Sequence, residues 1–188
     1  KTESFWQLFG KQLAALHQVT GSYFGLDSDN YMGALPQHNN PSGNWCDFFA
    51  MQRLEPQVRM AVNRGLLPDG YVPRFEKLYR KLPSLFPAEP PALLHGDLWS
   101  GNYLCDAQGQ PVLIDPAVYY GHSSVDMAMT TLFGGFDELF YKAYQYYRPL
   151  PPGYRERWEI ANLYPLLIHL NLFGTGYLAD IVHTVRRF

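Results

Sequence analysis

The fold of this chain is decided by residues 94–102, LHGDLWSGN, together with Ile114-Asp115-Pro116 a short way downstream. Between these two stretches, short apolar runs at residues 103–105 and 111–114 flank the turn-forming sequence DAQGQ at 106–110. Apolar runs on either side of a Gly-containing turn are typical of a β-hairpin. A hairpin returns its second strand beside its first, so the two quoted stretches are predicted to meet at one end of it.

Three oxygen-bearing side chains, Asp97, Asn102 and Asp115, are predicted to converge at that end of the hairpin. Such a set suits phosphoryl transfer, in which a protein mostly positions the reactants and neutralises charge. Asp97 is the candidate general base for a hydroxyl proton. Asn102 and Asp115 are candidate ligands for Mg²⁺ on ATP phosphates, because hard oxygen atoms suit that ion. The spacing H-x-D-x-x-x-x-N followed by a strand-terminal Asp is that of a protein-kinase catalytic loop.

Each of these residues also has a purely structural interpretation. Asp97 could cap a turn, Asn102 could be a turn residue, and Asp115 could begin an Asp-Pro turn. The combined pattern favours the chemical roles. His95 is interpreted as a structural scaffold for the loop, because a second general base would be redundant. Four other histidines lack metal-ligand spacing and are expected to be ordinary surface or core residues: His17, His38, His169 and His183.

The composition limits the classes to which the protein can belong. The chain has 188 residues, 47% of them hydrophobic and 17% charged, with a formal net charge of −2 and a pI near 6.3. These values predict a globular chain with a sizeable core and exclude a disordered segment. Without a broad positive surface, nucleic-acid or anionic-membrane binding is not expected.

The cellular compartment of the protein and the redox state of its cysteines are predicted from motifs that do not occur in the sequence. No apolar run approaches the roughly 20 residues needed to span a bilayer, and the first residues do not have the layout of a signal peptide, so a cytoplasmic protein is expected. Cys46 and Cys105 form neither a C-x-x-C nor a zinc-ligand pattern. They are predicted to be buried free thiols and not a disulfide.

Periodicity predicts that the first part of the chain is mostly helical. Thr2 can cap a helix whose apolar positions recur at three- and four-residue steps and which ends near Gly21. Residues 22–44 are rich in Gly, Asn, Asp and Pro and are expected to form a long ordered loop. A helical pattern returns over residues 45–63, where Pro56 should kink the helix or begin a second one.

Helical patterns also dominate the remainder of the chain. A short helix fits residues 74–82, and the prolines that follow it precede a short apolar step at residues 92–94. Beyond Ser123 the pattern is helical almost to the end. Breaks are expected at Gly134-Gly135, around residues 149–153 and at residues 174–176. The predicted fold class is therefore α+β, mainly helical, with one small β-hairpin.

The sequence around the hairpin resembles the fructosamine kinase family, which includes bacterial ribulosamine and erythrulosamine 3-kinases. The simpler pattern H-G-D-x-x-x-x-N is shared with aminoglycoside and choline kinases, whereas Trp99-Ser100-Gly101 and Tyr119-Tyr120-Gly121-His122 are closer to the fructosamine kinases. The resemblance also covers Asp115-Pro116-Ala117, residues 25–37, 44–45, 53–57 and 126–136. It implies a protein-kinase-like C-terminal lobe whose small β-hairpin carries the active site.

The resemblance implies ATP-dependent phosphorylation of the 3-hydroxyl of a ketosamine, ribulosamine or fructosamine, on a protein lysine. The unstable product would shed the sugar and so deglycate the amine. By the same resemblance Asp97 is the base, and Asn102 and Asp115 hold magnesium. Trp99 would lie against the sugar or the ketoamine stem, although a core-packing role is an equal alternative. Asp126 resembles a structural Asp at the start of a helix and is expected to be a scaffold.

Part of the kinase pattern does not occur in this sequence. Neither a G-x-G-x-x-G loop nor a strand of the V-A-I-K type is found within the 188 residues. We therefore expect residues 1–188 to be a single C-terminal catalytic lobe, with the N-terminal nucleotide-binding lobe absent from this chain. Such a lobe should have little or no kinase activity alone. Its expected partners are the missing lobe and glycated protein lysines or small ketosamines.

Other functions stay open at the level of sequence. The near alternative is a small-molecule kinase of the aminoglycoside or choline type. An aminoglycoside site should be strongly acidic, and a choline site needs an aromatic cage, which 14 Tyr and 12 Phe permit. From other classes, a Mg-dependent hydrolase and a non-catalytic binding module are alternatives. The oxygen ligands suit Mg²⁺ better than Zn²⁺, and a binding module would not need both Asp97 and Asp115.

Overall fold

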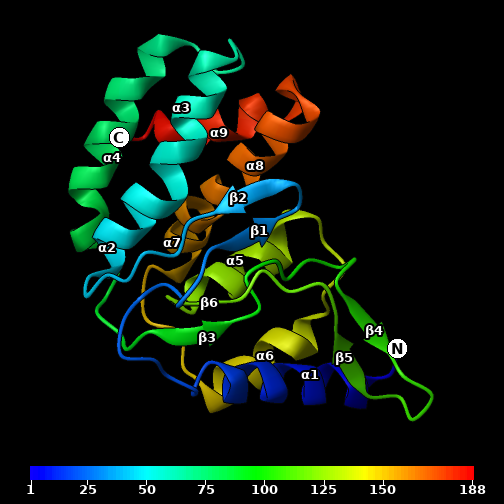
Figure 1. Ribbon diagram of the computed structural model, residues 1–188. Coiled ribbons are helices and arrows are strands. Elements are labelled where there is room, and N and C mark those ends of the chain that lie inside the picture. Colours follow the sequence, from blue (N-terminus) through cyan, green and yellow to red (C-terminus); the bar gives the residue numbers. More distant parts are fainter.

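The computed structural model describes all of residues 1–188, and most of them lie in helices (Figure 1). The α-helices are α1 (Glu3–Leu16), α2 (Trp45–Phe48), α3 (Glu55–Asn63), α4 (Val72–Leu85), α5 (Ser124–Leu132), α6 (Glu138–Tyr147), α7 (Tyr154–Ala161), α8 (Leu163–Phe173) and α9 (Leu178–Val185). A π-helix, η1 (Phe49–Leu54), and two 3₁₀ turns, η2 (Asp69–Tyr71) and η3 (Thr175–Tyr177), complete the helical part. None of the helices has the length and apolar character needed to cross a membrane.

The strands form three separate two-stranded antiparallel sheets, where the sequence predicted one hairpin. The expected hairpin is confirmed as β4 (Tyr103–Cys105) paired with β5 (Pro111–Leu113). A second pair joins β3 (Ala92–Leu94) to β6 (Tyr119–Gly121), which precede and follow that hairpin in the sequence. The third, β1 (Asn30–Met32) with β2 (Leu35–Gln37), lies inside the segment predicted to be only a loop. Strands of three residues are too short for an alternating pattern to show.

The first helix is capped as predicted but ends earlier than predicted. The side chain of Thr2 accepts a hydrogen bond from Phe5 N at 3.2 Å, and the helix ends at Leu16, not near Gly21. The following residues pair instead with the β3 region, because Leu93 N donates to Val19 O at 2.8 Å and Gly21 N donates to Pro91 O at 2.9 Å. Long-range backbone pairing therefore overrides the local helical pattern.

The helical region from Trp45 to Asn63 is continuous but irregular. Pro56 stands in the first turn of α3, which confirms the predicted second helix, since Pro lacks the N–H that this position leaves unused. The π-helix between α2 and α3 was not predicted. It buries Arg53, whose guanidinium lies 4.0 Å from the ring centre of Tyr119 and donates to Asn39 Oδ1 at 2.7 Å. The π-helix thereby joins the β1–β2 segment to the strand β6.

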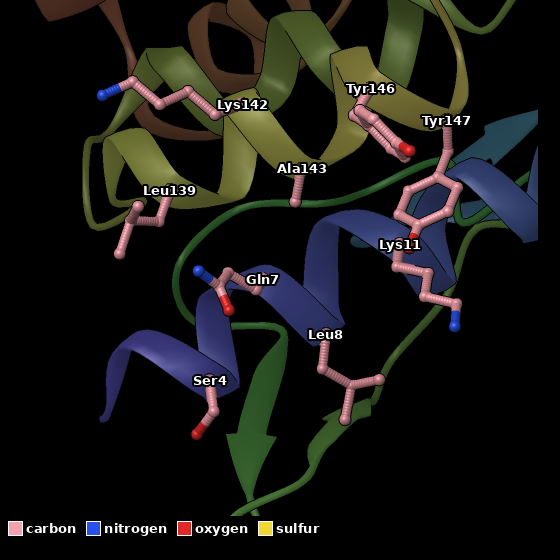
Figure 2. A pocket seen from close by; sticks show the side chains of 9 residues that line it. All are labelled: Ser4, Gln7, Leu8, Lys11, Leu139, Lys142, Ala143, Tyr146 and Tyr147. Carbon is pink, nitrogen blue, oxygen red and sulfur yellow. The ribbon is translucent and has the colours of Figure 1, made fainter.

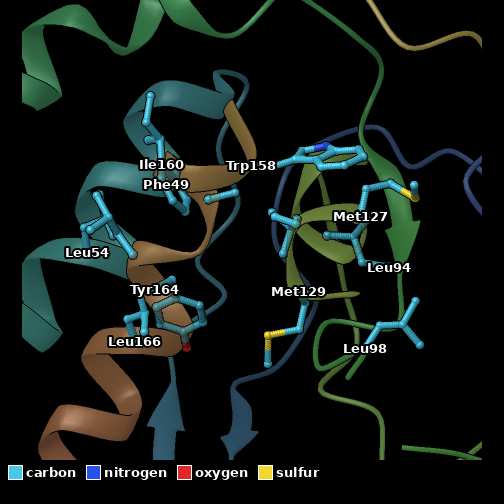
Figure 3. Packing of buried hydrophobic residues seen from close by; sticks show 14 of the residues in the cluster. Phe49, Leu54, Leu94, Leu98, Met127, Met129, Trp158, Ile160, Tyr164 and Leu166 are labelled. Atoms are coloured by element: carbon cyan, nitrogen blue, oxygen red, sulfur yellow. The ribbon is translucent and has the colours of Figure 1, made fainter. Parts of the chain in front are cut away.

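One part of the core lies between α7, α8 and η1 on one side and α5 and β3 on the other (Figure 3). At the opposite end of the molecule α1 packs against α6 (Figure 1). Gly10 permits this approach, because a Cβ at that position would overlap the carbonyl oxygen of Phe140. A shallow groove of about 450 Å³ follows these two helices (Figure 2). Its lining contains none of the candidate site residues.

The chain breaks predicted in the C-terminal half are confirmed. Gly134 and Gly135 have positive φ angles of 69° and 90° between α5 and α6. Gly153, with φ of 77°, precedes α7, and Gly174, with φ of 91°, ends α8. The two cysteines are free, as predicted, but Cys105 is exposed on the β4–β5 hairpin and Cys46 is partly exposed, so the expectation of buried thiols was wrong.

Candidate active site

The loop after β3 is shaped by a glycine that no other residue can replace without strain. Gly96 has a φ of +84°, and a Cβ there would overlap the carbonyl oxygen of Ala117. On the same side, Ala117 N donates to His95 O at 2.8 Å. The loop that carries Asp97 is therefore held against the segment that follows β5.

Asp97 and Asn102 are in direct contact. Asn102 Nδ2 donates to the carbonyl oxygen of Asp97 at 2.8 Å and to its carboxylate Oδ2 at 2.9 Å. These bonds use both amide hydrogens, which fixes the orientation of the amide and leaves Oδ1 of Asn102 without a hydrogen-bond partner in the protein. Asn102 is only 6% exposed, so its rotamer is set by the fold.

Asp115 is held beside this pair through its backbone neighbours. Ile114 N donates to Asn102 O at 3.1 Å, and His95 Nε2 donates to Ile114 O at 2.8 Å. Asp115 itself has a φ of +49°, the one positive value among the non-glycine residues, and its side chain is exposed. A left-handed non-glycine residue stores strain and is common at functional sites. The hairpin thus returns Asp115 to the loop, while no hydrogen bond joins its carboxylate to Asp97 or Asn102.

The contacts of His95 show how its side chain serves the loop. Because Nε2 donates to a carbonyl, Nδ1 carries a lone pair, and Asp97 N donates to it at 3.3 Å. Both ring nitrogens are therefore hydrogen-bonded to backbone groups: Nδ1 to the loop at Asp97 N, and Nε2 to Ile114 O, directly after β5. These contacts match the scaffold interpretation of His95 and leave no nitrogen for a second base.

A buried carboxylate, Asp126 in the first turn of α5, anchors the loop through hydrogen bonds to its backbone. It accepts hydrogen bonds from His95 N and Gly96 N, each at 2.8 Å, and from His17 Nε2 at 3.1 Å. Burial alone would raise the pKa of Asp126, but the hydrogen bonds from His17 Nε2 and Gly96 N outweigh it, and the pKa lies below its ordinary value. Asp126 therefore stays ionised and bonds the loop, not its own helix.

The sequence interpretation missed two members of this network. His17 follows α1 and is fully buried, and its Nδ1 lies 2.8 Å from the hydroxyl of Tyr144 on α6. With Nε2 donating to Asp126, Nδ1 of the neutral ring accepts from Tyr144. His17 and Tyr144 are far from Asp126 in sequence, and no spacing rule could have linked them. His17 was expected to be an ordinary surface or core histidine, whereas it is a hydrogen-bond donor to Asp126, the residue that anchors the loop.

The ionisation of Asp97 suits a proton acceptor. Burial raises the pKa of Asp97 above its ordinary value, although the hydrogen bond from Asn102 opposes the shift. A carboxylate with a raised pKa is a stronger base than an exposed one. Asp97 therefore has the electrostatic setting and the fixed geometry of a general base.

Trp99 lies on the surface of the loop and does not fill the core. Its indole is folded over Gly101, where a Cβ would overlap the ring, and it meets the ring of Phe133 edge to face at 5.9 Å between centres. The side chain remains 37% exposed. This exposure disfavours the core-packing alternative and leaves a ring face available for a ligand.

The donor set at the end of the hairpin fits Mg²⁺. The free Oδ1 of Asn102 and the exposed carboxylate of Asp115 are both hard oxygen donors. Within residues 1–188 no three His, Cys, Asp or Glu side chains cluster in a way that could hold a metal ion. A site with so few protein ligands suits an ion that takes its other ligands from phosphates and water, and it does not suit the zinc of a hydrolase.

The fold is kinase-like, as two solved structures show. Over 99% of its length the chain matches a solved structure of an amicoumacin kinase with a TM-score of 0.53 at 15% identity, which shows the fold alone, and the chain covers 58% of that protein. A Thermobifida fusca protein described as a fructosamine-3-kinase matches with a TM-score of 0.94 at 41% identity, over 99% of this chain and 65% of that one. The predicted fold class is thus confirmed.

Sequence comparison gives the family. The family model described as Fructosamine kinase matches residues 1–188. A Synechocystis protein named a probable ketoamine kinase is 49% identical over 177 residues, and mouse ketosamine-3-kinase is 39% identical over 165 residues. The matches cover 92% and 87% of this chain but only 58% and 53% of those relatives. The chain belongs to the fructosamine kinase family, and it spans between half and two thirds of the length of these relatives.

Proposed function

We propose that this chain carries the catalytic residues of a kinase that uses ATP to phosphorylate the 3-hydroxyl of ketosamines, ribulosamine or fructosamine, on protein lysines, with deglycation as the result. The observation that carries the proposal is the contact between Asp97 and Asn102. One amide positions the base and keeps its own oxygen free for a metal ion. The names of relatives, including mouse ketosamine-3-kinase and an Arabidopsis thaliana protein-ribulosamine 3-kinase, support the substrate class.

The residues divide the reaction between them. Asp97 accepts the proton of the sugar hydroxyl as that oxygen attacks the γ-phosphorus of ATP, and the bond to the β-phosphate oxygen breaks. Asn102 and Asp115 would hold Mg²⁺, which neutralises phosphate charge when bound. His95 and Asp126 act on the chemistry only by holding the backbone on which Asp97 stands.

We propose further that residues 1–188 form the C-terminal catalytic lobe and that activity needs a nucleotide-binding lobe. The length of the relatives supports this division. On the β4–β5 hairpin Leu104 and Val112 are paired and are 53% and 40% exposed, next to the segments that carry Asn102 and Asp115. Apolar side chains exposed beside the proposed metal ligands suit contact with a nucleotide base or with further protein.

The proposal is tested by phosphate transfer with the full-length protein, ATP and Mg²⁺. Ribulose-lysine, fructose-lysine, choline and kanamycin are offered separately, and the phosphorylated carbon is identified by NMR. We expect transfer to O3 of a ketosamine and none to kanamycin, because the pocket that contains Trp99 is lined by five exposed or partly exposed aromatic and imidazole side chains, Trp99 among them, and by no carboxylate. Transfer to choline or kanamycin alone, or hydrolysis without transfer, would overturn the assignment in favour of the other classes.

The division into lobes has its own test. The turnover number of isolated residues 1–188 is compared with that of the full-length protein at saturating ATP. We expect the isolated chain to have little or no turnover. Equal rates would contradict the need for a second lobe while leaving the assignment of the substrate intact.

A further inference from the structure

An aromatic pocket opens beside the loop that carries Asp97, and of its lining residues only Trp99 has been given a role so far. Its volume is about 420 Å³, within the range of small-molecule sites. The lining residues come from the loop, the end of α5, α8 and η3, and they are Trp99, Phe133, His169, Phe173 and Tyr177. Because these residues are far apart in sequence, only the tertiary fold assembles the pocket.

The rings are arranged around one histidine and remain open to a ligand. The ring centre of His169 lies 5.0 Å from those of Phe133 and Tyr177 and 5.4 Å from that of Phe173. Phe173 is 68% exposed. No acidic side chain lines the pocket. A patch of aromatic rings exposed together marks a binding surface more often than a region awaiting burial.

His169 adds a single hydrogen-bond acceptor to this aromatic surface. Its Nδ1 lies 2.7 Å from the carbonyl oxygen of Pro165, which can only accept, so Nδ1 carries the hydrogen. In the neutral ring Nε2 then carries the lone pair, and it has no hydrogen-bond partner in the protein. The pocket therefore offers ring faces together with one acceptor.

The pocket adjoins the proposed base. Trp99 N donates to Asp97 O at 3.2 Å, so a residue that lines the pocket stands on the same loop as the proposed base, two positions away. The indole of Trp99 is kept in place by Gly101, which has no side chain to displace it. A ligand that lies against Trp99 and His169 therefore also reaches the neighbourhood of the Asp97 carboxylate.

We propose that this pocket binds the amine side of the ketosamine, a proposal that rests on the function proposed above. The amine of a ketosamine is on C1 and the phosphorylated hydroxyl is on C3, so a substrate with its amine in the pocket can present O3 to Asp97. The protonated secondary amine lies against the ring faces and donates an N–H to Nε2 of His169. The aliphatic stem of the lysine packs on Phe173 and Tyr177.

The test uses the full-length kinase and two substrates with the same sugar, ribulose on Nα-acetyllysine and ribulose on methylamine. Phe173→Ala should raise KM for the lysine substrate by about three- to thirtyfold and change KM for the methylamine substrate less than twofold. His169→Phe keeps an aromatic ring but removes the acceptor, and it should raise KM for both substrates. Tyr146→Ala is the matched control, because Tyr146 is an exposed aromatic residue on α6 outside this pocket.

KM for ATP should be unchanged in every variant. An equal loss for both substrates in Phe173→Ala would overturn the proposal, as would a rise in KM for ATP, which would indicate that the pocket receives the nucleotide base. If the unaltered kinase phosphorylates neither ketosamine, both this proposal and the proposed function fail. Failure of the pocket alone leaves the turnover of the unaltered kinase intact, so the two failures are distinguishable.

Discussion

The loop of residues 95–102 and the end of the β4–β5 hairpin carry residues of one proposed site, yet their surroundings are opposite. The loop is supported from below, where the buried carboxylate of Asp126 accepts hydrogen bonds from His95 N and Gly96 N, and Asn102 fixes Asp97. At the hairpin end Asp115 is exposed and strained, and Leu104 is uncovered. From this difference we infer that the fold alone positions Asp97, the proposed base, whereas the proposed metal side is left open for ligands to complete.

The largest expected effect is a loss of kcat when Asp97, on the hydrogen-bonded loop, is replaced. Asp97→Asn in the full-length kinase should lower kcat by about 10²–10⁴, because the amide cannot accept the hydroxyl proton. The measurement is phosphate transfer to a ketosamine at saturating ATP. Circular dichroism should be unchanged, since Asn fills the same volume. An unaltered kcat would remove Asp97 as the base.

Loss of the anchor should cost stability as well as activity. Asp126→Ala leaves two buried N–H groups and His17 without their acceptor and should lower the free energy of unfolding by about 3–5 kcal/mol in urea titrations. Asp106→Ala is the matched control. Asp106 also accepts two backbone N–H groups, from Gln108 and Gln110 at 2.9 and 2.7 Å, but it does so at the partly exposed hairpin turn.

The control should cost about 1 kcal/mol or less, because water replaces the lost partner there. Similar losses in the two variants would contradict the importance of burial under the loop. A stable Asp126→Ala protein with full activity would show that the loop keeps its shape without the anchor.

Replacing the exposed Asp115 should affect activity without the loss of stability expected for Asp126→Ala. Asp115→Gly removes the proposed metal ligand and also relieves the positive φ of 49°, so stability should hold or rise slightly. The Mg²⁺ concentration needed for half-maximal activity should rise by about ten- to a hundredfold. Asp115→Asn tolerates the same φ and keeps one oxygen. Its Mg²⁺ requirement should therefore lie between that of the unaltered protein and that of Asp115→Gly. An unchanged magnesium dependence in Asp115→Gly would end the ligand assignment.

The smallest effect expected is a pH dependence of stability that is independent of the site. Burial lowers the pKa of His122 to about 4, against the opposing charge of Glu89. The ring is neutral, because Ser124 N donates to Nδ1 at 3.2 Å and Nε2 donates to Pro87 O at 3.2 Å. The Glu89 carboxylate 3.4 Å from Nδ1 is therefore a neighbour and not an ion-pair partner near neutral pH.

The unfolded chain binds a proton at this histidine below a pH of about 6.5, whereas the folded protein does so only near pH 4. Stability should therefore be constant above that range and fall by about 1–3 kcal/mol as the pH drops from about 6.5 to 4. Urea titrations at several pH values measure it. His122→Gln should flatten this part of the profile, whereas His38→Gln, at an exposed histidine, should not. If stability fell with the same slope between about pH 6.5 and 4 in His122→Gln, protonation of His122 would not be the cause of the fall.

How far sequence predicted the fold depended on how local each feature is. The cap at Thr2, the β4–β5 hairpin and the glycine breaks were predicted, because each depends on neighbouring residues. The strands β1, β2 and β6 and the π-helix were not. Their residues are selected by partners such as Ala117 and Val118, whose carbonyls accept hydrogen bonds from Gln37 and Asn30. Short elements held by distant partners carry no periodic pattern.

The same distinction separates the parts of the candidate site. By itself the sequence determined the motif with Asp97, Asn102 and Asp115 and the hairpin that joins them, because fixed spacing along a short chain segment limits where those side chains can lie. The packed fold was needed to show that His17 and Tyr144 support Asp126, that Trp99 is exposed, and that His169 is the centre of a pocket. The physical reason is that these contacts join residues whose separation in sequence places no constraint on their distance until the core has packed.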